Sequence, residues 1–158
     1  MKAATVKELK QELNKHSASK LVDLCLQLAR FKKENKELLT YLLYEVADEQ
    51  AYIQSVKQEI DDLISEVNTK STYFINKSAR KVLRITKKYI RYSKKKETEI
   101  ELLIYYCEAI SNISYPINRN TTLYNIYKRQ IASVRKIILG LHEDLQYDFN
   151  IKLKSMLK

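Results

Sequence analysis

The sequence predicts an all-α protein, and three observations carry that prediction. Its 158 residues include one Gly and one Pro, too few for the turns that a β protein needs at every hairpin. Leu, Ile, Lys and Glu are abundant, and these residues tolerate or favour helix. Apolar residues also recur three or four positions apart, as on one face of a helix. We expect a helical bundle or a short solenoid of stacked αα-hairpins, with about seven helices.

One part of the chain occurs twice in similar form, at approximately 17–46 and 78–110. The matched positions are Ser17-Ala18 with Ser78-Ala79, 61 positions apart, and Glu37-Leu38-Leu39 with Glu101-Leu102-Leu103, 64 positions apart. Repetition on this scale is typical of solenoid scaffolds, which bind other molecules more often than they catalyse. We therefore expect two related hairpin units inside a single all-helical domain that spans 1–158.

Capping patterns and apolar periodicity predict four helices in the first half of the chain. Thr5 with Glu8 forms a capping-box pattern, and Asn35 and Asp48 are candidate N-caps for later helices. Whether the chain bends near Ala47 or continues straight is left open. The expected apolar faces are Val6, Leu9 and Leu13; Leu21, Leu24, Cys25 and Leu28; Leu38, Leu39, Leu42, Leu43 and Val46; and Tyr52, Ile53, Val56, Ile60, Leu63, Ile64 and Val67.

The second half predicts a hairpin, a loop and two further helices. A helix that begins at about Thr72 or Ser78 and ends at about Tyr92 is followed by the lysine-rich turn 93–96. The clearest loop is 114–121, which contains Pro116. Gly140 either ends or kinks the long helix before it. The expected apolar faces are Leu102, Leu103, Tyr106, Ala109, Ile110 and Ile113; Leu123, Ile126, Tyr127, Ile131, Val134, Ile137, Ile138 and Leu141; and Leu145, Phe149, Leu153 and Leu157.

Charge is distributed unevenly along the chain. Residues 1–70 contain 11 Lys and Arg against 12 Asp and Glu, whereas residues 71–158 contain 18 against 7. The formal net charge is +10, and nearly all of it comes from the second half. This asymmetry favours a polyanionic partner for that half.

The predicted helix from Lys77 to Lys95 carries its basic residues on one face. The eight that fall within an arc of roughly 120° are Lys77, Arg80, Lys81, Arg84, Lys87, Lys88, Arg91 and Lys95. No acidic residue lies between Glu66 and Glu97, so like charges three or four positions apart repel one another along the helix. We interpret this face as a polyanion-binding site, with nucleic acid as the leading ligand. The alternative is a basic face that is solvated or is paired with acidic residues of another helix, such as Glu59, Asp61 and Asp62.

The turn of the first hairpin is also basic. If the two hairpins stack, the residues of the first turn lie on the same edge as the turn of the second hairpin. The residues added to the polyanion-binding site for this reason are Arg30, Lys32, Lys33 and Lys94, with Lys36 and Lys96 beside them.

Twelve tyrosines occur with no tryptophan. Tyr41, Tyr89, Tyr92 and Tyr105 lie near the two basic turns and could stack on bases. A second group, Tyr105-Tyr106 and Tyr124…Tyr127, flanks the proline loop and could line a groove for a protein or peptide. The alternative for all of them is the edge of the core, with the hydroxyl in water.

Catalysis and metal binding find little support in the sequence. His142, with Glu143, Asp144 and Asp148 after it, is the only His–carboxylate cluster, and His142 and Asp144 share no helical face unless the helix breaks at Gly140. Metal sites need two or more His or Cys at helical spacing, and a single glycine cannot form a phosphate-binding loop. We expect a non-enzymatic protein without metal, cofactor or small-molecule ligand.

The cellular setting is predicted from the cysteines and from the N-terminus. Cys25 and Cys107 each lie in an apolar stripe, as buried thiols do in a reducing compartment. The first residues are charged and amphipathic, unlike a signal peptide, and no apolar run reaches the length of a membrane span. We expect a cytoplasmic protein.

Four segments resemble an uncharacterised family of bacterial all-helical proteins. They are Leu9…Leu13 with Ser19-Lys20-Leu21, Ser78-Ala79-Arg80-Lys81, Glu101-Leu102-Leu103-Ile104-Tyr105-Tyr106, and Gly140-Leu141-His142-Glu143-Asp144-Leu145. The resemblance spans most of the chain. It implies a bacterial protein with an all-helical fold, and it implies no activity.

These observations together favour a helical-repeat binding or scaffold protein. It would contact a macromolecular partner through the basic helix, and a protein partner or self-association is the first expectation. The alternative is an RNA- or DNA-binding protein that contacts the nucleic-acid backbone without sequence specificity, through the basic face of 77–96.

Overall fold

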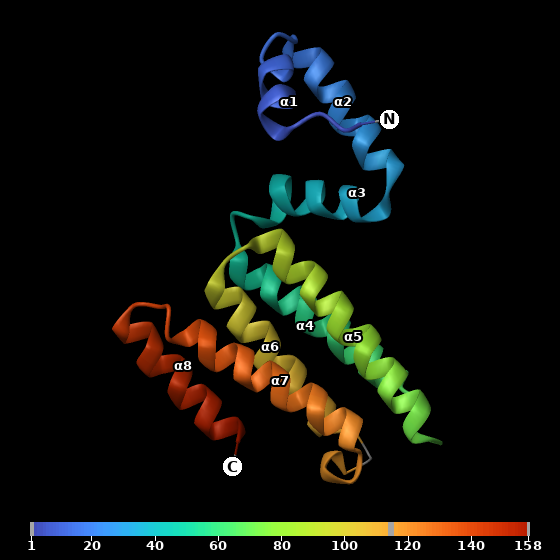
Figure 1. The fold of residues 1–158 in the computed structure, drawn as a ribbon, viewed down its shortest axis with the longest axis vertical. Helices are drawn as coiled ribbons and strands as arrows, with labels where there is room; N and C mark the ends of the chain where they lie inside the picture. Colours follow the sequence, from blue (N-terminus) through green and yellow to red (C-terminus); the bar gives the residue numbers. More distant parts are fainter. Residues whose placement is uncertain (1, 114–115, 158) are drawn as a thin grey trace. The chain divides into compact units, whose positions relative to one another are not determined.

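The structure is a computed structural model that describes residues 2–113 and 116–157. Within these residues the chain forms eight α-helices and no strand, which confirms the predicted all-α class (Figure 1). The chain divides into two compact units, Met1–Tyr44 and Glu45–Lys158, and each is described by itself. Whether the two act as the single domain expected from the sequence stays a prediction.

The first unit contains three short helices. They are α1 (Val6–Leu13), α2 (Ala18–Phe31) and α3 (Lys33–Thr40), and a π-helical turn, η1 (Tyr41–Glu45), crosses the boundary between the units. The predicted capping box is present, since the Thr5 amide donates to Glu8 Oε2 at 2.7 Å and the Glu8 amide donates to Thr5 Oγ1 at 3.3 Å. The helix α2 packs against α3.

The connection between α2 and α3 differs from its prediction. Lys32 alone joins the two helices, in an extended conformation with φ −142° and ψ 142°. Asn35 therefore lies inside α3 and does not cap it. Its side-chain amide instead donates to the carbonyl of Leu28 at 2.8 Å, which ties the start of α3 to the end of α2.

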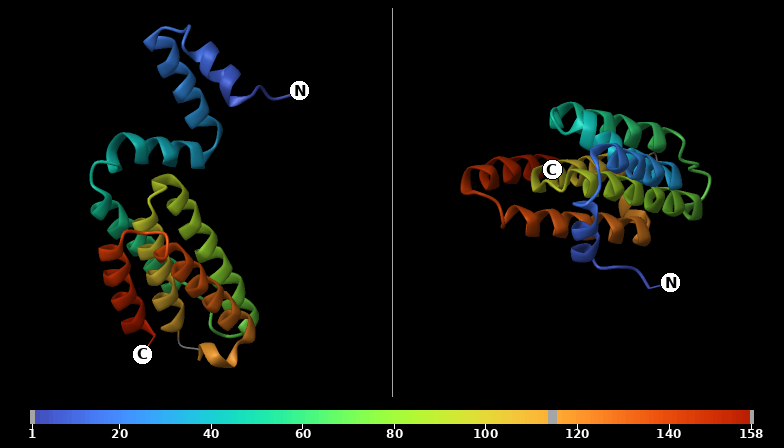
Figure 2. Two further views of the ribbon diagram at one scale, coloured as in Figure 1. Left: turned by 60° about the vertical axis from the view of Figure 1, so that its left-hand side comes forward. Right: turned by 90° about the horizontal axis from the view of Figure 1, so that it is seen from above.

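The second unit is an antiparallel array of five helices with short connections. They are α4 (Glu49–Ser65), α5 (Thr72–Ser93), α6 (Lys96–Ser111), α7 (Thr121–Ile138) and α8 (Glu143–Met156), with a 3₁₀ turn, η2 (Ile117–Arg119), before α7. Successive helices run in opposite directions, as Figures 1 and 2 show from three sides. Each helix packs against the next one along the chain, as in an up-and-down bundle.

The element boundaries answer three questions that the sequence left open. The helical conformation ends after η1, and a separate helix, α4, begins after its N-cap residue Asp48. The Asp48 Oδ1 accepts a hydrogen bond from the Ala51 amide at 2.9 Å. The basic helix α5 begins at Thr72 under the Ser71 cap, so Ser78 is internal to it. The helix α7 ends at Ile138 with Leu139 as its C-cap, so it stops before Gly140 and is not kinked by it; Gly140 does not adopt the left-handed conformation.

The core of the second unit is centred on α6. This helix contacts α4, α5, α7 and α8. Its residues with at most 1% exposure are Thr98, Ile100, Leu102, Leu103, Ile104, Tyr106, Cys107 and Ile110. A helix with buried residues on most of its sides must be surrounded by other elements, and α6 packs against four helices.

The two cysteines have different environments. Cys107 is buried in α6, as predicted, and burial raises the pKa of its thiol to about 12. The prediction of a buried Cys25 is wrong, because its side chain is exposed. The physical reason is that α1, α2 and α3 bury none of their residues fully.

The predicted internal repeat has only a loose structural counterpart. Both α2–α3 and α5–α6 are packed helix pairs, joined by one residue and by two residues respectively. The matched serines differ in role, since Ser17 caps the start of α2 and Ser78 lies in the second turn of α5. A common ancestry of the two helix pairs stays a prediction.

Candidate polyanion-binding face

The candidate site is built on α5, whose sequence separates an apolar side from a basic side. The buried side of this 22-residue helix consists of Ile75, Ala79, Val82, Thr86, Ile90 and Tyr92. It packs against α4, α6 and α7. The Thr86 hydroxyl, buried among these residues, donates to the Val82 carbonyl at 3.0 Å, so its polar atom is satisfied.

The opposite side of α5 is basic and open. Six of the predicted residues are exposed, and we call them the basic face: Lys77, Arg80, Lys81, Arg84, Lys87 and Arg91. Within the described part of the chain, none of the six forms an ion pair with an acidic side chain. Their mutual repulsion is therefore left uncompensated by neighbouring helices, at a few tenths of a kcal/mol for each adjacent pair.

Acidic residues of α4, which could have covered this face, make other contacts. Glu59 accepts a hydrogen bond from the Tyr89 hydroxyl at 2.5 Å, and Asp61 accepts one from the Tyr105 hydroxyl at 2.5 Å. Asp62 accepts from the Gln58 side-chain amide at 3.0 Å. These carboxylates therefore face the tyrosines of α5 and α6 or their own helix, and they leave the lysines and arginines of the basic face in water.

Two residues predicted for the site are engaged elsewhere. Lys88 is half-buried, with its Nζ 4.4 Å from the centre of the Tyr89 ring. Lys95 places its Nζ 2.9 Å from Glu49 Oε2. Lys88 lies in α5, and Lys95 lies in the two-residue connection between α5 and α6.

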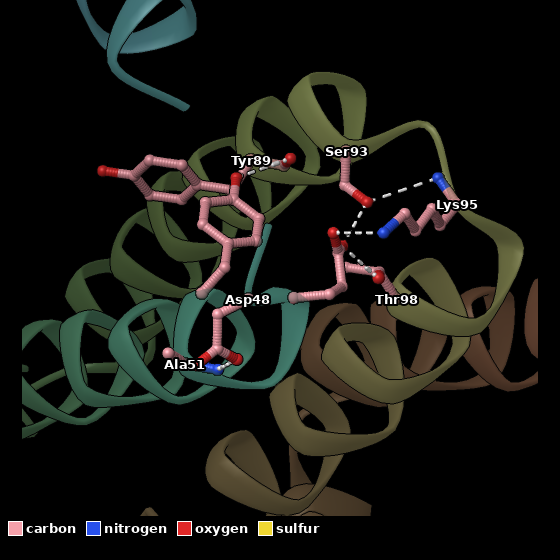
Figure 3. A network of polar contacts seen from close by, with 8 residues as sticks. Asp48, Ala51, Tyr89, Ser93, Lys95 and Thr98 are labelled. Carbon is pink, nitrogen blue, oxygen red and sulfur yellow. Dashed lines mark hydrogen bonds and ion pairs between the residues drawn. The ribbon is translucent and has the colours of Figure 1, made fainter. Parts of the chain in front are cut away.

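The contacts of Glu49 explain why the end of α5 is fixed. Its carboxylate also accepts hydrogen bonds from the hydroxyls of Ser93 and Thr98, the latter at 2.6 Å. Figure 3 shows Ser93, Lys95 and Thr98 converging on one point, with Asp48 and Ala51 at the start of α4 nearby. One carboxylate at the start of α4 thus joins the end of α5 to the start of α6.

Lys94 is placed by a backbone conformation that lysine rarely adopts. Its φ is 59° and its ψ is 7°, in the left-handed region, and its amide donates to the Ile90 carbonyl at 3.0 Å. Glycine is the usual residue at this position after a helix. The lysine side chain is exposed, and its charge lies at the C-terminal end of α5.

The predicted basic residues of the first hairpin belong to the other unit. Arg30, Lys32 and Lys33 are exposed at the α2–α3 connection, and Lys33 Nζ lies 3.6 Å from Glu37 Oε1. The idea that they share one edge with the residues of α5 depends on stacked repeats and stays a prediction.

Most of the tyrosines proposed for base stacking are occupied by the fold. Tyr41 and Tyr92 are buried, and Tyr89 and Tyr105 are half-buried, with their hydroxyls bonded to carboxylates. Tyr106, suggested for a groove by the proline loop, is fully buried, and its hydroxyl donates to the Ala79 carbonyl at 3.0 Å. These rings are core or core-edge residues. The expectation that the hydroxyls lie in water is wrong for Tyr89, Tyr105 and Tyr106, whose hydroxyls donate to protein oxygens.

One aromatic residue that the sequence reasoning missed does lie on the basic side. Tyr73, in the first turn of α5, is 66% exposed, and it borders a shallow hollow with Lys77, Ser78, Arg80, Lys81 and Arg84. The signal was available, because Tyr73 is one helical turn before Lys77 and so falls within the same arc. Its ring stands edge-on to Phe74, with centroids 5.4 Å apart.

The only His–carboxylate cluster in the sequence forms a surface pair. Gly140 lies in the turn between α7 and α8, and His142 occupies the N-cap position of α8 without a side-chain capping bond. The Nδ1 atom of His142 lies 3.4 Å from Asp144 Oδ2. The two side chains are 76% and 90% exposed, so neither is held in the water-excluded setting that strengthens catalytic electrostatics. Among the residues described, no group of three His, Cys, Asp or Glu is arranged to hold a metal ion.

Comparisons with known proteins identified no similar family, protein or structure. No family model, curated protein or solved structure matches the chain. In the described ranges, the helices are too short or too polar for any of them to cross a lipid bilayer.

Proposed function

We propose that this chain is a non-enzymatic helical binding protein whose basic face on α5 binds a polyanionic macromolecule, and that the polyanion is nucleic acid held by its phosphates. The observation that carries the proposal is the set of six exposed lysines and arginines without an acidic partner in the described residues. An unrelieved positive surface of this kind is stabilised when a ligand supplies the negative charge.

The dimensions of the face fit a nucleic-acid backbone. From Lys77 to Arg91 the helix rises by roughly 21 Å, about the axial length of six base pairs. Arginines can hold phosphates through two parallel hydrogen bonds, while lysines act as point charges. Since α5 has its apolar side buried in the bundle, it presents a fixed row of charge that needs no folding on binding.

The absence of base-reading features on this face favours binding without sequence specificity. The basic face consists of long cations on one straight helix, and such contacts position a protein on the backbone without reading bases. The affinity should therefore depend strongly on salt and weakly on sequence.

Charge reversal of the face tests the proposal. The triple variant Arg80→Glu, Arg84→Glu and Arg91→Glu should lose binding to fluorescein-labelled RNA and DNA, measured by fluorescence anisotropy at about 50 mM salt. The new glutamates stand three or four residues from Lys77, Lys81, Lys87 and Lys88, so helix stability should be unchanged or slightly raised. A melting temperature at or above that of the parent protein would show that lost binding is not lost folding.

A charge-matched control comes from the first unit. Lys7→Glu, Lys10→Glu and Lys20→Glu change the net charge by the same amount at exposed positions outside the basic face. This control should retain most of the affinity. Equal losses in both variants would mean that net charge alone governs binding, and no binding by the parent protein at low salt would contradict the proposal.

A further inference from the structure

The first unit exposes more apolar surface than a unit of its size can leave in water without a partner. Its large apolar side chains with at least 41% exposure are Val6, Leu9, Leu13, Val22, Leu26, Leu28, Phe31, Leu42, Leu43 and Tyr44. Units this small rarely hold a sufficient core of their own. Apolar surface on this scale marks an interaction site.

A groove between α2 and α3 forms one part of that surface. Its floor is Ala29 and Leu39, both half-buried, and its walls include Leu26, Leu43 and Tyr44, at 43%, 62% and 76% exposure. The small side chain of Ala29 leaves room for a side chain from outside. The π-helical turn η1 presents Leu42, Leu43 and Tyr44 to solvent in succession, a run that proteins keep exposed only for a function.

The rim of this groove is positively charged. Arg30, Lys33 and Lys36 line it, on both sides of the α2–α3 connection. Within the described part of the chain, Arg30 and Lys36 have no acidic partner, and Lys33 is 89% exposed with only a 3.6 Å contact to Glu37. A ligand for the groove must therefore be apolar along its centre and acidic along its margins.

We propose that this groove is the docking site for an acidic amphipathic helix of a partner protein. Leucine-like side chains at i, i+3 or i+4 and i+7 would enter over Ala29 and Leu39, and flanking Glu or Asp would meet the three rim cations. The lining residues Lys33 to Tyr44 extend over roughly 15 Å, which matches about three helical turns.

A second copy of this chain fits the groove less well. A twofold contact would place the rim cations of one copy opposite the same cations of the other, and the chain carries a formal net charge of +10. Nucleic acid fits less well too, since the walls are mainly leucine and alanine, with Tyr44 as the only aromatic ring.

The full-length protein and three synthetic peptides test the proposal. The first is a fluorescein-labelled 14-residue amphipathic helix of about five Leu and nine Glu or Ala, the second has the same composition with the apolar stripe scrambled, and the third replaces Glu by Lys. We expect the first to bind at least about tenfold more tightly than either of the others, with a moderate loss of affinity on adding salt.

Matched variants locate the binding. Leu43→Asp, and separately Arg30→Glu with Lys36→Glu, should each weaken binding of the first peptide by roughly tenfold or more. The control is Leu28→Asp, because Leu28 is 61% exposed, against 62% for Leu43. It lines a neighbouring uncharged hollow that shares only Ala29 and Leu39 with the basic groove, and it is not itself a lining residue of that groove. The control should bind as the parent protein does. Circular dichroism melts of all variants show whether each remains folded.

Four results would overturn the proposal. Equal binding of the scrambled peptide would show that charge alone acts. Displacement of the peptide by RNA from the Arg80→Glu, Arg84→Glu and Arg91→Glu variant, in which the basic face is reversed, would assign the rim to nucleic acid. A dimer in light scattering that Leu43→Asp dissolves would assign the groove to a second copy. No peptide binding, with a melting temperature lowered by Leu43→Asp and not by Leu28→Asp, would mean that another part of the same chain covers the groove. Titration of the Arg80→Glu, Arg84→Glu and Arg91→Glu variant separates this proposal from the proposed function, because that variant lacks the basic face of α5 and should still bind the first peptide.

Discussion

Individual residues show where the chain accepts a cost in stability. Lys94 adopts a left-handed conformation at the end of α5, where glycine is the usual residue. The side-chain β-carbon makes that conformation unfavourable by about 1 kcal/mol. In return the position carries a positive charge at the end of the basic helix, so we interpret this lysine as serving binding at the expense of stability.

The exchange Lys94→Gly should separate those two roles. We expect the free energy of unfolding to rise by about 0.5–1 kcal/mol, because relief of the strained backbone outweighs the greater freedom of glycine in the unfolded chain. Nucleic-acid affinity should fall a few-fold with the loss of one charge. Urea denaturation and anisotropy measure the two effects, and a variant that is less stable than the parent would contradict the assigned backbone strain.

Tyr73 is the exposed aromatic residue on the basic side of α5. If single-stranded nucleic acid follows the basic face, a base can stack on this ring. The exchange Tyr73→Ala should then weaken binding of single strands by about 1–3 kcal/mol and should affect duplexes little, since their bases are not free to stack. A parallel loss for both kinds of ligand would show that the ring only shapes the surface.

At the scale of elements, Glu101 of α6 joins three helices of the second unit. Its Oε1 lies 2.6 Å from Lys57 Nζ of α4 and 3.2 Å from Lys152 Nζ of α8, and its side chain is 19% exposed. Burial by itself would raise the pKa of Glu101, but the hydrogen bonds and charges of the two lysines outweigh burial and lower it below 4.5. The carboxylate form is therefore favoured in the folded protein.

The exchange Glu101→Gln should destabilise the bundle in a pH-dependent way. A depressed carboxyl pKa contributes stability above the unfolded-state pKa near 4.5, and that contribution is lost as the pH falls through the lower folded-state value. We expect a loss of about 1–3 kcal/mol at pH 7, shrinking toward pH 3. Denaturation at both values checks this, with Glu97→Gln on the same helix as an exposed control. A loss that is equal at both pH values would contradict the ion-pair account.

The helix pattern was predictable because it depends on local sequence. The capping box at Thr5, the cap at Asp48, the end of a helix just before Gly140 and the basic arc of α5 all follow from residues a few positions apart. The predictions for individual side chains failed where a residue of one helix contacts a residue of another helix. Lys95 pairs with Glu49, 46 positions away, and Tyr89 bonds Glu59 across a helix interface. No local pattern contains such partners.

At the scale of the whole molecule, the placement of charge distinguishes the proposed binding surface from the rest. Residues 67–96 contain 11 Lys and Arg and no Asp or Glu. The acidic residues of the second unit occur on the other helices, where carboxylates such as Glu49, Glu59 and Glu101 bind lysines or tyrosine hydroxyls. These carboxylates thus have partners inside the bundle, whereas the six cations of the basic face have no acidic partner among the described residues.

The salt dependence of nucleic-acid binding tests this account most directly. If the six residues of the basic face release counterions from a duplex, the slope of log Kobs against log salt should be about −5, and Arg80→Gln with Arg84→Gln and Arg91→Gln should reduce its magnitude by about three. The measurement is fluorescence anisotropy with one short duplex between about 50 and 300 mM salt. A slope near zero, or a steep slope that the three substitutions leave unchanged, would contradict the claim that α5 is the nucleic-acid interface.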